Sequence, residues 1–334
     1  MKIEQDLYFY SKDQPFSYFF GRGFSCNRYA IDQGDEIWLI DAGTSAARRV
    51  KILLKQMKKD GLDPKKITKV FATHGHGDHV NGFPALSKEI EKLGGKCELY
   101  IHELDEHFVK GGDDDFISYL KQAAGEYSFD LFPAPQFLLK IISRYSMGKA
   151  PEGLKPILLK DNDEIKGEKY TLRIYHTPGH SEGHICPYLK EKRALFLGDL
   201  IDQFFDHKPP VNLPSSDFVA FKKSLEKVRD IDIDIFCSAH GKDIPRGIEN
   251  NRKYAEDVLK QLCFGYNRTI ELLKQKKAIK ISEFSGKFPK TIWQFQEQKT
   301  LPFAIFKYLK SIGVVDDKNK KFSLIGEVPS PETI

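Results

Sequence analysis

The feature that most constrains this chain is a short run of four potential metal ligands: His74, His76, Asp78 and His79. The run follows an apolar segment and precedes a segment of helical period, so it is expected in the turn between a strand and a helix. In an extended turn alternate side chains point the same way, so His74 and His76 can converge on one ion while Asp78 and His79 face a second site. Because buried imidazoles and carboxylates need partners, the run indicates a metal centre held by a rigid sheet rather than an ordinary polar loop.

Three further ligand candidates follow later apolar segments: His180, Asp199 and His240. Each adjoins a glycine and stands where a strand is expected to end, which is where α/β proteins assemble their sites. Taken singly, a histidine or aspartate at such a place is as often an ordinary loop residue as a ligand. Together with the first run, these residues complete a set of seven.

Strand-like and helix-like segments alternate along the body of the chain, which indicates the α/β class. Strands are expected over 27–31, 37–40, 70–72, 98–101, 172–175, 194–197 and 233–237, and helices over 46–59, 79–93 and 215–229. Residues 103–155 interrupt the alternation with helices expected at 116–124 and 136–145, so we interpret them as a helical insertion over one face. We find no internal repeat, which argues against solenoids and propellers.

The last part of the chain differs from the body in pattern and in charge. A long helix is expected from 247 to 277, followed by helices over 281–288 and 301–312 and a hairpin over 314–324. Residues 251–334 hold 16 Lys and Arg against 9 Asp and Glu, whereas the whole chain carries a net charge of +5. We therefore expect a domain over 1–250 that carries the ligand candidates and a basic, helical C-terminal module over 251–334.

The ligand pattern H-x-H-x-D-H, followed by H, D and H at strand ends, resembles that of the metallo-β-lactamase-fold hydrolases. The segment Thr-Pro-Gly-His-Ser-Glu-Gly-His at 177–184 is similar to their glyoxalase II-like branch. The resemblance covers about residues 7–245 and implies an αββα sandwich with two metal ions at one edge. It further implies that one ion is held by His74, His76 and His180, the other by Asp78, His79 and His240, and that Asp199 bridges them.

The remaining histidines are weighed against this set. His184 and His176 flank His180 and are expected to orient it or its loop through hydrogen bonds, with His184 as the second-shell candidate. His102, His107 and His207 have no motif around them and are expected to be ordinary histidines. Asp202, Phe204 and Phe205 are expected to line the site rather than to act chemically.

The resemblance implies hydrolysis. Two adjacent divalent ions lower the pKa of a shared water molecule, so that hydroxide is available near neutral pH to attack the substrate. Asp78 is the catalytic candidate, because its carboxylate can orient the hydroxide and later pass a proton to the leaving group. The expected substrate is a small acyl ester, thioester or lactone, with the phenylalanine-rich stretch at 128–137 as a lid. A β-lactam is disfavoured, because the true lactamases of this fold commonly carry Cys or His at the position of Asp199.

Two alternatives stay open. The C-terminal module resembles the winged-helix tail of lactamase-like proteins, some of which are endoribonucleases, so the same ions can serve a phosphodiesterase or endoribonuclease. RNA would then bind through lysines such as Lys274 and the turn at 318–321. We favour docking of the module on the body or on a second subunit of a homodimer, because the arginine and aromatic pattern of single-strand binders is missing. The other alternative is an iron-dependent redox enzyme of the persulfide dioxygenase type, or a metal-binding protein without catalysis.

The sequence constrains the identity of the metal and the cellular location less tightly than it constrains the fold. The ligand set suits zinc, which we expect, but iron and manganese fit as well. No apolar run approaches the 18 or so residues that span a bilayer, and the first residues lack the order of a signal peptide. The five cysteines form no C-x-x-C pair. We therefore expect a cytoplasmic protein with reduced thiols and no membrane partner.

Overall fold

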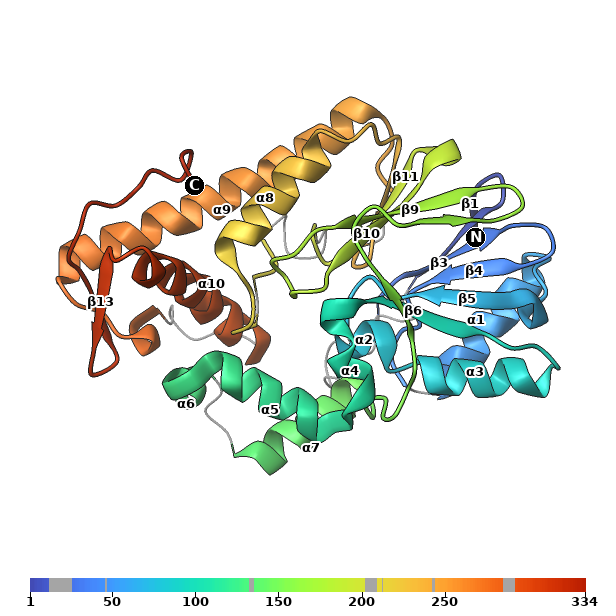
Figure 1. Ribbon diagram of the computed structural model, residues 1–334, viewed down its shortest axis with the longest axis horizontal. Helices are drawn as coiled ribbons and strands as arrows, with labels where there is room; N and C mark the ends of the chain where they lie inside the picture. The colour runs from blue at the N-terminus through green and yellow to red at the C-terminus, as the bar shows by residue number, and fades with distance from the viewer. Residues whose placement is uncertain are drawn as a thin grey trace.

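The computed structural model describes residues 1–11, 26–45, 47–131, 135–201, 209–211, 213–241, 244–284 and 292–334. Its centre is a pair of stacked β-sheets (Figure 1). The larger sheet contains, in spatial order, β1 (Lys2–Glu4), β2 (Leu7–Tyr10), β3 (Arg28–Asp32), β4 (Ile37–Ile40), β5 (Ile67–Phe71), β6 (Glu98–His102) and β7 (Ile157–Leu159). The smaller sheet contains β12 (Ile235–Ser238), β11 (Ala194–Gly198), β10 (Ile185–Leu189), β9 (Thr171–His176) and β8 (Glu164–Lys166).

Helices cover the outer face of each sheet. Helices α1 (Ala47–Lys59) and α3 (Phe83–Lys92) pack on the larger sheet, and α8 (Phe218–Arg229) and α9 (Ile248–Lys276) lie on the side of the smaller one. The result is the four-layer αββα sandwich expected from the sequence. The α/β class is therefore confirmed.

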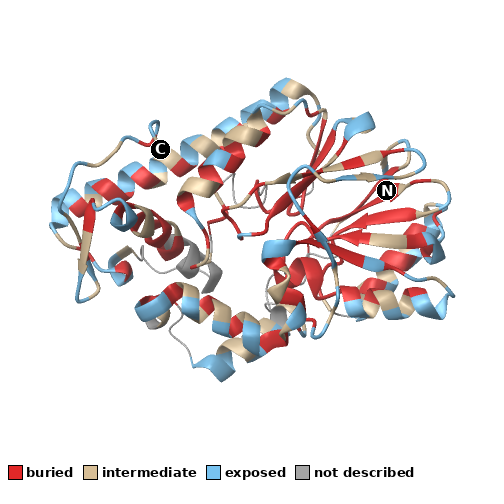
Figure 2. Ribbon diagram, in the orientation of Figure 1, coloured by how far each residue is buried: buried red, intermediate tan, exposed pale blue. Residues whose placement is uncertain are grey.

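Successive side chains along each strand point to opposite faces of its sheet, so the central strands pack against the other sheet on one face and against helices on the other. On β4, Trp38 and Ile40 point between the sheets, whereas Ile37 and Leu39 pack against α1 and α3. On the smaller sheet, Phe196 faces the larger sheet and its neighbour Leu197 faces α8. Figure 2 shows the strands as mostly buried and the helices as buried along one side only. Each strand therefore contributes to two cores, as the period of two requires.

The segment expected as one helix over 79–93 is divided in the structure, and this prediction is corrected. Helix α2 (Gly77–Val80) ends at Asn81, and α3 begins after Gly82 with a proline in its first turn. A side chain at Gly82 would overlap the carbonyl oxygen of Ala42, so the chain is pressed against the end of β4 at this point. The break places α2 directly beside the sheet edge. Strands β1, β2, β7, β8 and β10 were not predicted at all.

The insertion is helical, as predicted. It consists of α4 (His107–Lys110), α5 (Gly112–Ala124), α6 (Ser128–Leu131) and α7 (Gln136–Met147). The expected lid at 128–137 lies only partly within the described residues, because 132–134 fall outside them. The insertion joins the body near the ligand run, where Asn81 donates to the carbonyl oxygens of Met147 and Gly148.

The C-terminal segment packs on α8 and α9. Helix α10 (Ile292–Ser311) precedes the hairpin of β13 (Val315–Lys318) and β14 (Lys321–Leu324), which confirms the predicted helix and hairpin. A single apolar core runs from the smaller sheet through these helices to Phe322. The helix expected over 281–288 is described only as a 3-10 turn at Ile281–Phe284. The winged-helix assignment and the division at residue 250 stay predictions.

Among the described residues, the structure contains no helix with both the length and the apolar character needed to cross a membrane.

Candidate metal centre

The seven predicted ligands come together at one edge of the sandwich. They lie in four segments that each follow a strand: the turn after β5 with α2, the loop between β9 and β10, the end of β11 and the end of β12. All seven side chains are buried. Two sheets thus contribute to one site, because β5 of the larger sheet and β11 of the smaller sheet end beside each other.

The first group consists of three imidazoles. The Nε2 atom of His180 lies 3.2 Å from Nε2 of His74 and 2.8 Å from Nδ1 of His76. One carboxylate oxygen of Asp199, Oδ2, lies 3.4 Å from the same His180 nitrogen. Ligands about 2.0–2.1 Å from a tetrahedral zinc ion are separated by about 3.3–3.4 Å. The spacings of 3.2 and 3.4 Å match one ion between these atoms, and the spacing of 2.8 Å is shorter.

The second group pairs two imidazoles with two carboxylates. Nε2 of His240 lies 3.3 Å from Oδ2 of Asp78 and 3.1 Å from Oδ1 of Asp199. Nε2 of His79 lies 3.6 Å and 3.2 Å from the same two oxygens. Asp199 therefore presents Oδ2 to the first group and Oδ1 to the second, which is the geometry of a bridging ligand.

The donor atoms of the two groups fit a pair of cations. Within the described part of the chain, Nε2 of His79 and Oδ1 of Asp199 are buried without a hydrogen-bond partner, although they face each other. A buried polar atom without a partner is costly, and a cation between these two atoms would satisfy both.

Burial sets the charge of the three-histidine group. It lowers the pKa of His74 and His76 well below the usual value, and the neighbouring imidazoles lower it further. Burial also lowers the pKa of His180. The Nδ1–H of His180 donates to the carbonyl oxygen of Pro210 at 2.7 Å, so its Nε2 carries the lone pair that faces the group. These imidazoles are therefore neutral at pH 7, as metal ligands must be.

In the metal-free site the carboxylates and His79 carry the charge, and an ion at Nε2 of His79 would displace the proton of that ring. Burial opposes ionisation of Asp78, but the imidazoles of His79 and His240 lower its pKa to about 2. The same two imidazoles hold the pKa of Asp199 well below its usual range against its burial. Burial disfavours a charged His79 as well, yet the carboxylate of Asp41 and its acidic neighbours raise its pKa well above the usual value.

Asp41 is a functional residue that the sequence analysis missed. Its Oδ2 lies 2.9 Å from Nδ1 of His79, and its carboxylate also accepts from the backbone N–H and the hydroxyl of Thr73. This carboxylate orients the ring so that Nε2 faces the site. The signal was available, because Asp41 directly follows the apolar strand β4, as the ligand candidates follow other apolar strands. Its φ of +61° places it in the left-handed region, which is strained for a non-glycine residue.

Asp105 was missed as well. This fully buried carboxylate accepts from the backbone N–H of Gly75 at 2.7 Å, from the hydroxyl of Ser181 at 2.8 Å and from the N–H of Gly183 at 2.8 Å. Burial raises its pKa in spite of these bonds. Asp105 thus ties the His74–His76 turn to the loop of His180. It stands at the start of the insertion, which the sequence analysis treated only as a cover.

The other histidines have different positions. His184 is buried, and its Nε2 accepts from the backbone N–H of Asp199 at 3.1 Å, so its hydrogen bond within the ligand set is with Asp199 rather than with the ring of His180. His176 lies 2.8 Å from the carbonyl oxygen of Glu182 through Nε2, and its ring stacks on that of His102. Asp202, Phe204, Phe205 and His207 lie outside the described residues.

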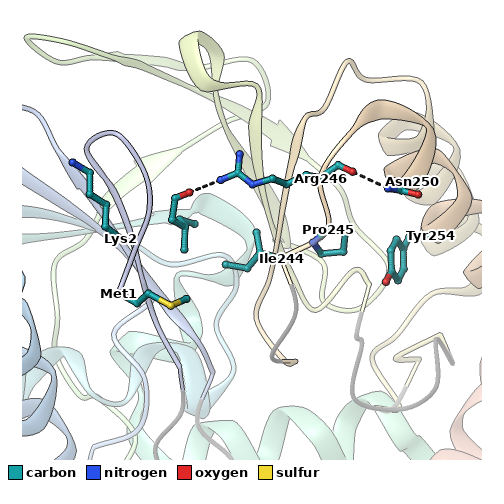
Figure 3. A pocket seen from close by; sticks show the side chains of 8 residues that line it. Met1, Lys2, Ile244, Pro245, Arg246, Asn250 and Tyr254 are labelled. Atoms are coloured by element: carbon teal, nitrogen blue, oxygen red, sulfur yellow. Dashed lines mark hydrogen bonds between the residues drawn. The ribbon is translucent and has the colours of Figure 1, made fainter.

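A separate open hollow of about 620 Å³ lies beside the N-terminal strand and the start of α9 (Figure 3). Arg246 crosses it and donates to the carbonyl oxygen of Ile3. None of the seven predicted ligands lines this hollow; its lining residues are Met1, Lys2, Ile3, Ile244, Pro245, Arg246, Asn250 and Tyr254.

The four-layer sandwich with a converging set of histidines and aspartates at its edge defines a class of metal-binding enzymes. The family model of the metallo-beta-lactamase superfamily matches residues 21–240, and the chain belongs to that superfamily. The resemblance inferred from the motif is confirmed.

The chain matches only part of the length of two curated relatives. The chain is 26% identical over 246 residues to the lactamase-like protein adaB of Aspergillus niger, which covers 73% of this chain and 59% of that protein. It is 27% identical over 218 residues to the atrochrysone carboxyl ACP thioesterase of Passalora fulva, covering 64% of this chain and 48% of that protein. The chain thus spans about half of the length of these relatives.

A solved structure matches almost the whole chain. A metallo-beta-lactamase family protein of Thermus thermophilus superposes with a TM-score of 0.69 at 20% identity, covering 97% of this chain and 100% of that one. At this identity the likeness concerns the fold alone. Because the superposition covers almost all of the chain, it takes in most of the C-terminal helices and hairpin as well as the sandwich.

Proposed function

We propose that this protein hydrolyses small acyl esters, thioesters or lactones with two divalent ions, zinc being the expected metal. The observation that carries the proposal is the placement of Asp199, whose two carboxylate oxygens face two separate ligand groups. The three-histidine group would hold one ion, and Asp78, His79 and His240 would hold the other. Seven ligands in this arrangement support a dinuclear site.

When bound, the ions supply a water molecule of lowered pKa and polarise the substrate oxygen that becomes negative. The residues of the chain contribute orientation and proton transfer. Asp78 is ionised at neutral pH, because its pKa is about 2, so it enters the reaction as a proton acceptor. We expect its carboxylate to take a proton from the attacking water and to return it to the leaving group. Asp41 and His184 keep His79 and Asp199 in place during these steps.

A thioester is the favoured substrate within this class. The similarity to a protein named as an acyl carrier protein thioesterase supports it. An apolar side chain beside the site is consistent with an acyl group: the buried Phe108 of the insertion contacts the ring of His76, with ring centroids 5.7 Å apart. The exposed side chains of Phe137 and Ile141, one turn apart on α7, extend the apolar surface of the insertion.

Hydrolysis of RNA is the second candidate. A segment of 87 residues is 37% identical to the ribonuclease Z of Pediococcus pentosaceus, which covers 26% of this chain. The charges of the C-terminal module weigh against it. Lys276 pairs with Glu283, and Lys310 pairs with Asp317. Paired lysines release fewer counterions when RNA binds and therefore contribute less affinity.

The test combines metal content with rates on a homoserine lactone, an acyl thioester and a single-stranded RNA. We expect two equivalents of metal and thioester or lactone turnover that is lost in Asp78→Ala and His180→Ala. Asp230→Ala serves as the matched control, because it removes an exposed carboxylate far from the centre. A protein loaded with two ions that turns over no ester, thioester or lactone would refute the acyl proposal. Metal-dependent cleavage of RNA alone would establish the second candidate.

A further inference from the structure

The metal-site histidine His180 is held by a loop that precedes α8. The carbonyl oxygen of Pro210 accepts from its Nδ1–H at 2.7 Å, and the hydroxyl of Ser216 donates to its backbone carbonyl at 3.1 Å. One contact fixes the rotation of the ring, and the other fixes the backbone. Together they determine where Nε2 points, because His180 is buried and bonded on both sides.

The C-terminal helix α10 holds this loop in turn. The hydroxyl of Thr300 donates to the carbonyl oxygen of Val211 at 2.8 Å, one residue beyond Pro210. Two turns further along the helix, the Nζ of Lys307 donates to the carbonyl oxygens of Pro214 and Ser216 at 2.7 and 3.0 Å. Side chains of one helix therefore hold the loop at Val211 and again at Pro214 and Ser216.

This support differs from that of the other ligand rings with a described contact on the second nitrogen. Nδ1 of His79 meets Asp41, and Nδ1 of His74 lies 3.2 Å from the hydroxyl of Thr73. Both partners belong to the sandwich itself. The partner of His180 is a backbone carbonyl, whose position depends on how the chain around Pro210 is held.

We infer that Thr300 and Lys307 are positioning residues of the metal centre, and that α10 acts on the ion of the three-histidine group through Pro210 and His180. The inference deepens the proposed function and rests on it, since it requires an ion at this group. The mechanism is direct. Without the Thr300 hydroxyl, the buried carbonyl of Val211 loses a donor, and the adjoining peptide that carries the Pro210 oxygen is free to reorient.

The test compares two threonines of the C-terminal segment. Thr300→Val removes the donor to the loop, whereas Thr269→Val removes a hydroxyl that donates at 2.8 Å to Gly265 within α9. Both side chains are buried, so the chemical change is the same. Stepwise affinities for Zn²⁺ and Co²⁺ are measured by competition with a chelator, and the Co²⁺ absorption spectrum reports ligand geometry.

We expect Thr300→Val to weaken the binding of one ion by about 10–100-fold and to alter the Co²⁺ spectrum, while the other ion binds as in the wild type. Thr300→Ser should restore both properties, and Thr269→Val should change neither. Lys307→Met should weaken the same ion. If Thr300→Val binds both ions with wild-type affinity and spectrum, the inference is wrong.

A second measurement needs no metal. In the metal-free chain, Thr300→Val should raise amide hydrogen exchange in the peptides that carry Val211 and Ser216, and Thr269→Val should not. If the wild-type chain binds no ion, the proposed function fails, and this exchange difference still decides whether α10 anchors the loop. Equal exchange in both variants would refute the anchoring.

Discussion

The close approach of the His180 loop to α8 gives a prediction that tests how the site is positioned. Gly179 precedes the ligand and has a φ of +130°, and a Cβ added there would overlap the backbone N and Cα atoms of Phe221. Backbone atoms of a helix cannot rotate away from a clash. Gly179→Ala should therefore push the loop off α8 and carry His180 with it.

The expected change in the free energy of unfolding for Gly179→Ala has three contributions. Overpacking against a fixed backbone costs about 1–3 kcal/mol, and a strained φ costs about 1–3 kcal/mol. The smaller entropy of the unfolded chain returns about 0.4–1 kcal/mol. Gly179→Ala should thus lower the free energy of unfolding by about 1–6 kcal/mol. Gly61→Ala is the matched control, because its φ is +85° but nothing lies within 4 Å of the added Cβ. The control should cost at most about 1–2 kcal/mol, because it carries backbone strain without a clash and gains the same entropy term.

Urea unfolding of the metal-free variants measures the difference, and chelator competition measures metal affinity. Gly179→Ala should also weaken the ion that His180 holds, whereas Gly61→Ala should leave both ions unaffected. Equal destabilisation by the two substitutions would refute the close-approach argument. A large loss of stability with unchanged metal affinity would show that the contact supports the fold without positioning the ligand.

Three further predictions concern the centre and the core. Asp41→Asn removes the charge that orients His79 and should weaken one ion by about 10–100-fold in chelator competition; unchanged affinity would contradict this role. Because the pKa of Asp78 is lowered to about 2 in the fold, its ionisation adds at most about 2 kcal/mol of stability to the metal-free chain. That contribution is present above pH 3.8 and is lost as the pH falls toward 2, so urea unfolding of Asp78→Asn should show a flatter pH dependence than the wild type between pH 5 and 3. Phe71→Ala empties space between the sheets and should cost about 3–5 kcal/mol in the same assay; a loss below about 1 kcal/mol would contradict the packing described.

The ligands were predictable because their signal is local. They follow apolar strands, and all but His79 lie beside a glycine, so the pattern of neighbours along the chain places them at a sheet edge without knowledge of the fold. The same holds for the long helix at 248–276 and for the C-terminal hairpin, whose periodicity lies within one segment. Local patterns determine the kind of element, and the ends of strands determine where a site forms.

Asp105 was not predictable, because its partners are distant in sequence. Asp105 accepts hydrogen bonds from the backbone N–H groups of Gly75 and Gly183, and no sequence pattern around Asp105 indicates either partner. The strands β1 and β10 were missed because their own sequences give a weak strand signal. Lys2–Glu4 is too short to show alternation, and Ile185–Leu189 contains Pro187 in a strand that pairs on both sides. A proline within an apolar run lowers the strand signal, and tertiary packing overrode it here.

The loop that carries His180 is supported by two segments outside the sandwich. The insertion contacts this loop directly, and α10 acts on it through Pro210. Asp105 of the insertion accepts from Ser181, and α10 fixes the carbonyl that bonds the ring of His180. Phe108 of the insertion contacts the ring of His76, so we expect the insertion to contact substrate, and α10 is tied to the metal centre through its contacts with the loop at 210–216. A change in either one made to fit another substrate will therefore also act on the geometry of the three-histidine group. This coupling predicts that variants selected for new substrates at these segments will differ from the wild type in metal affinity, which the chelator competition measures directly.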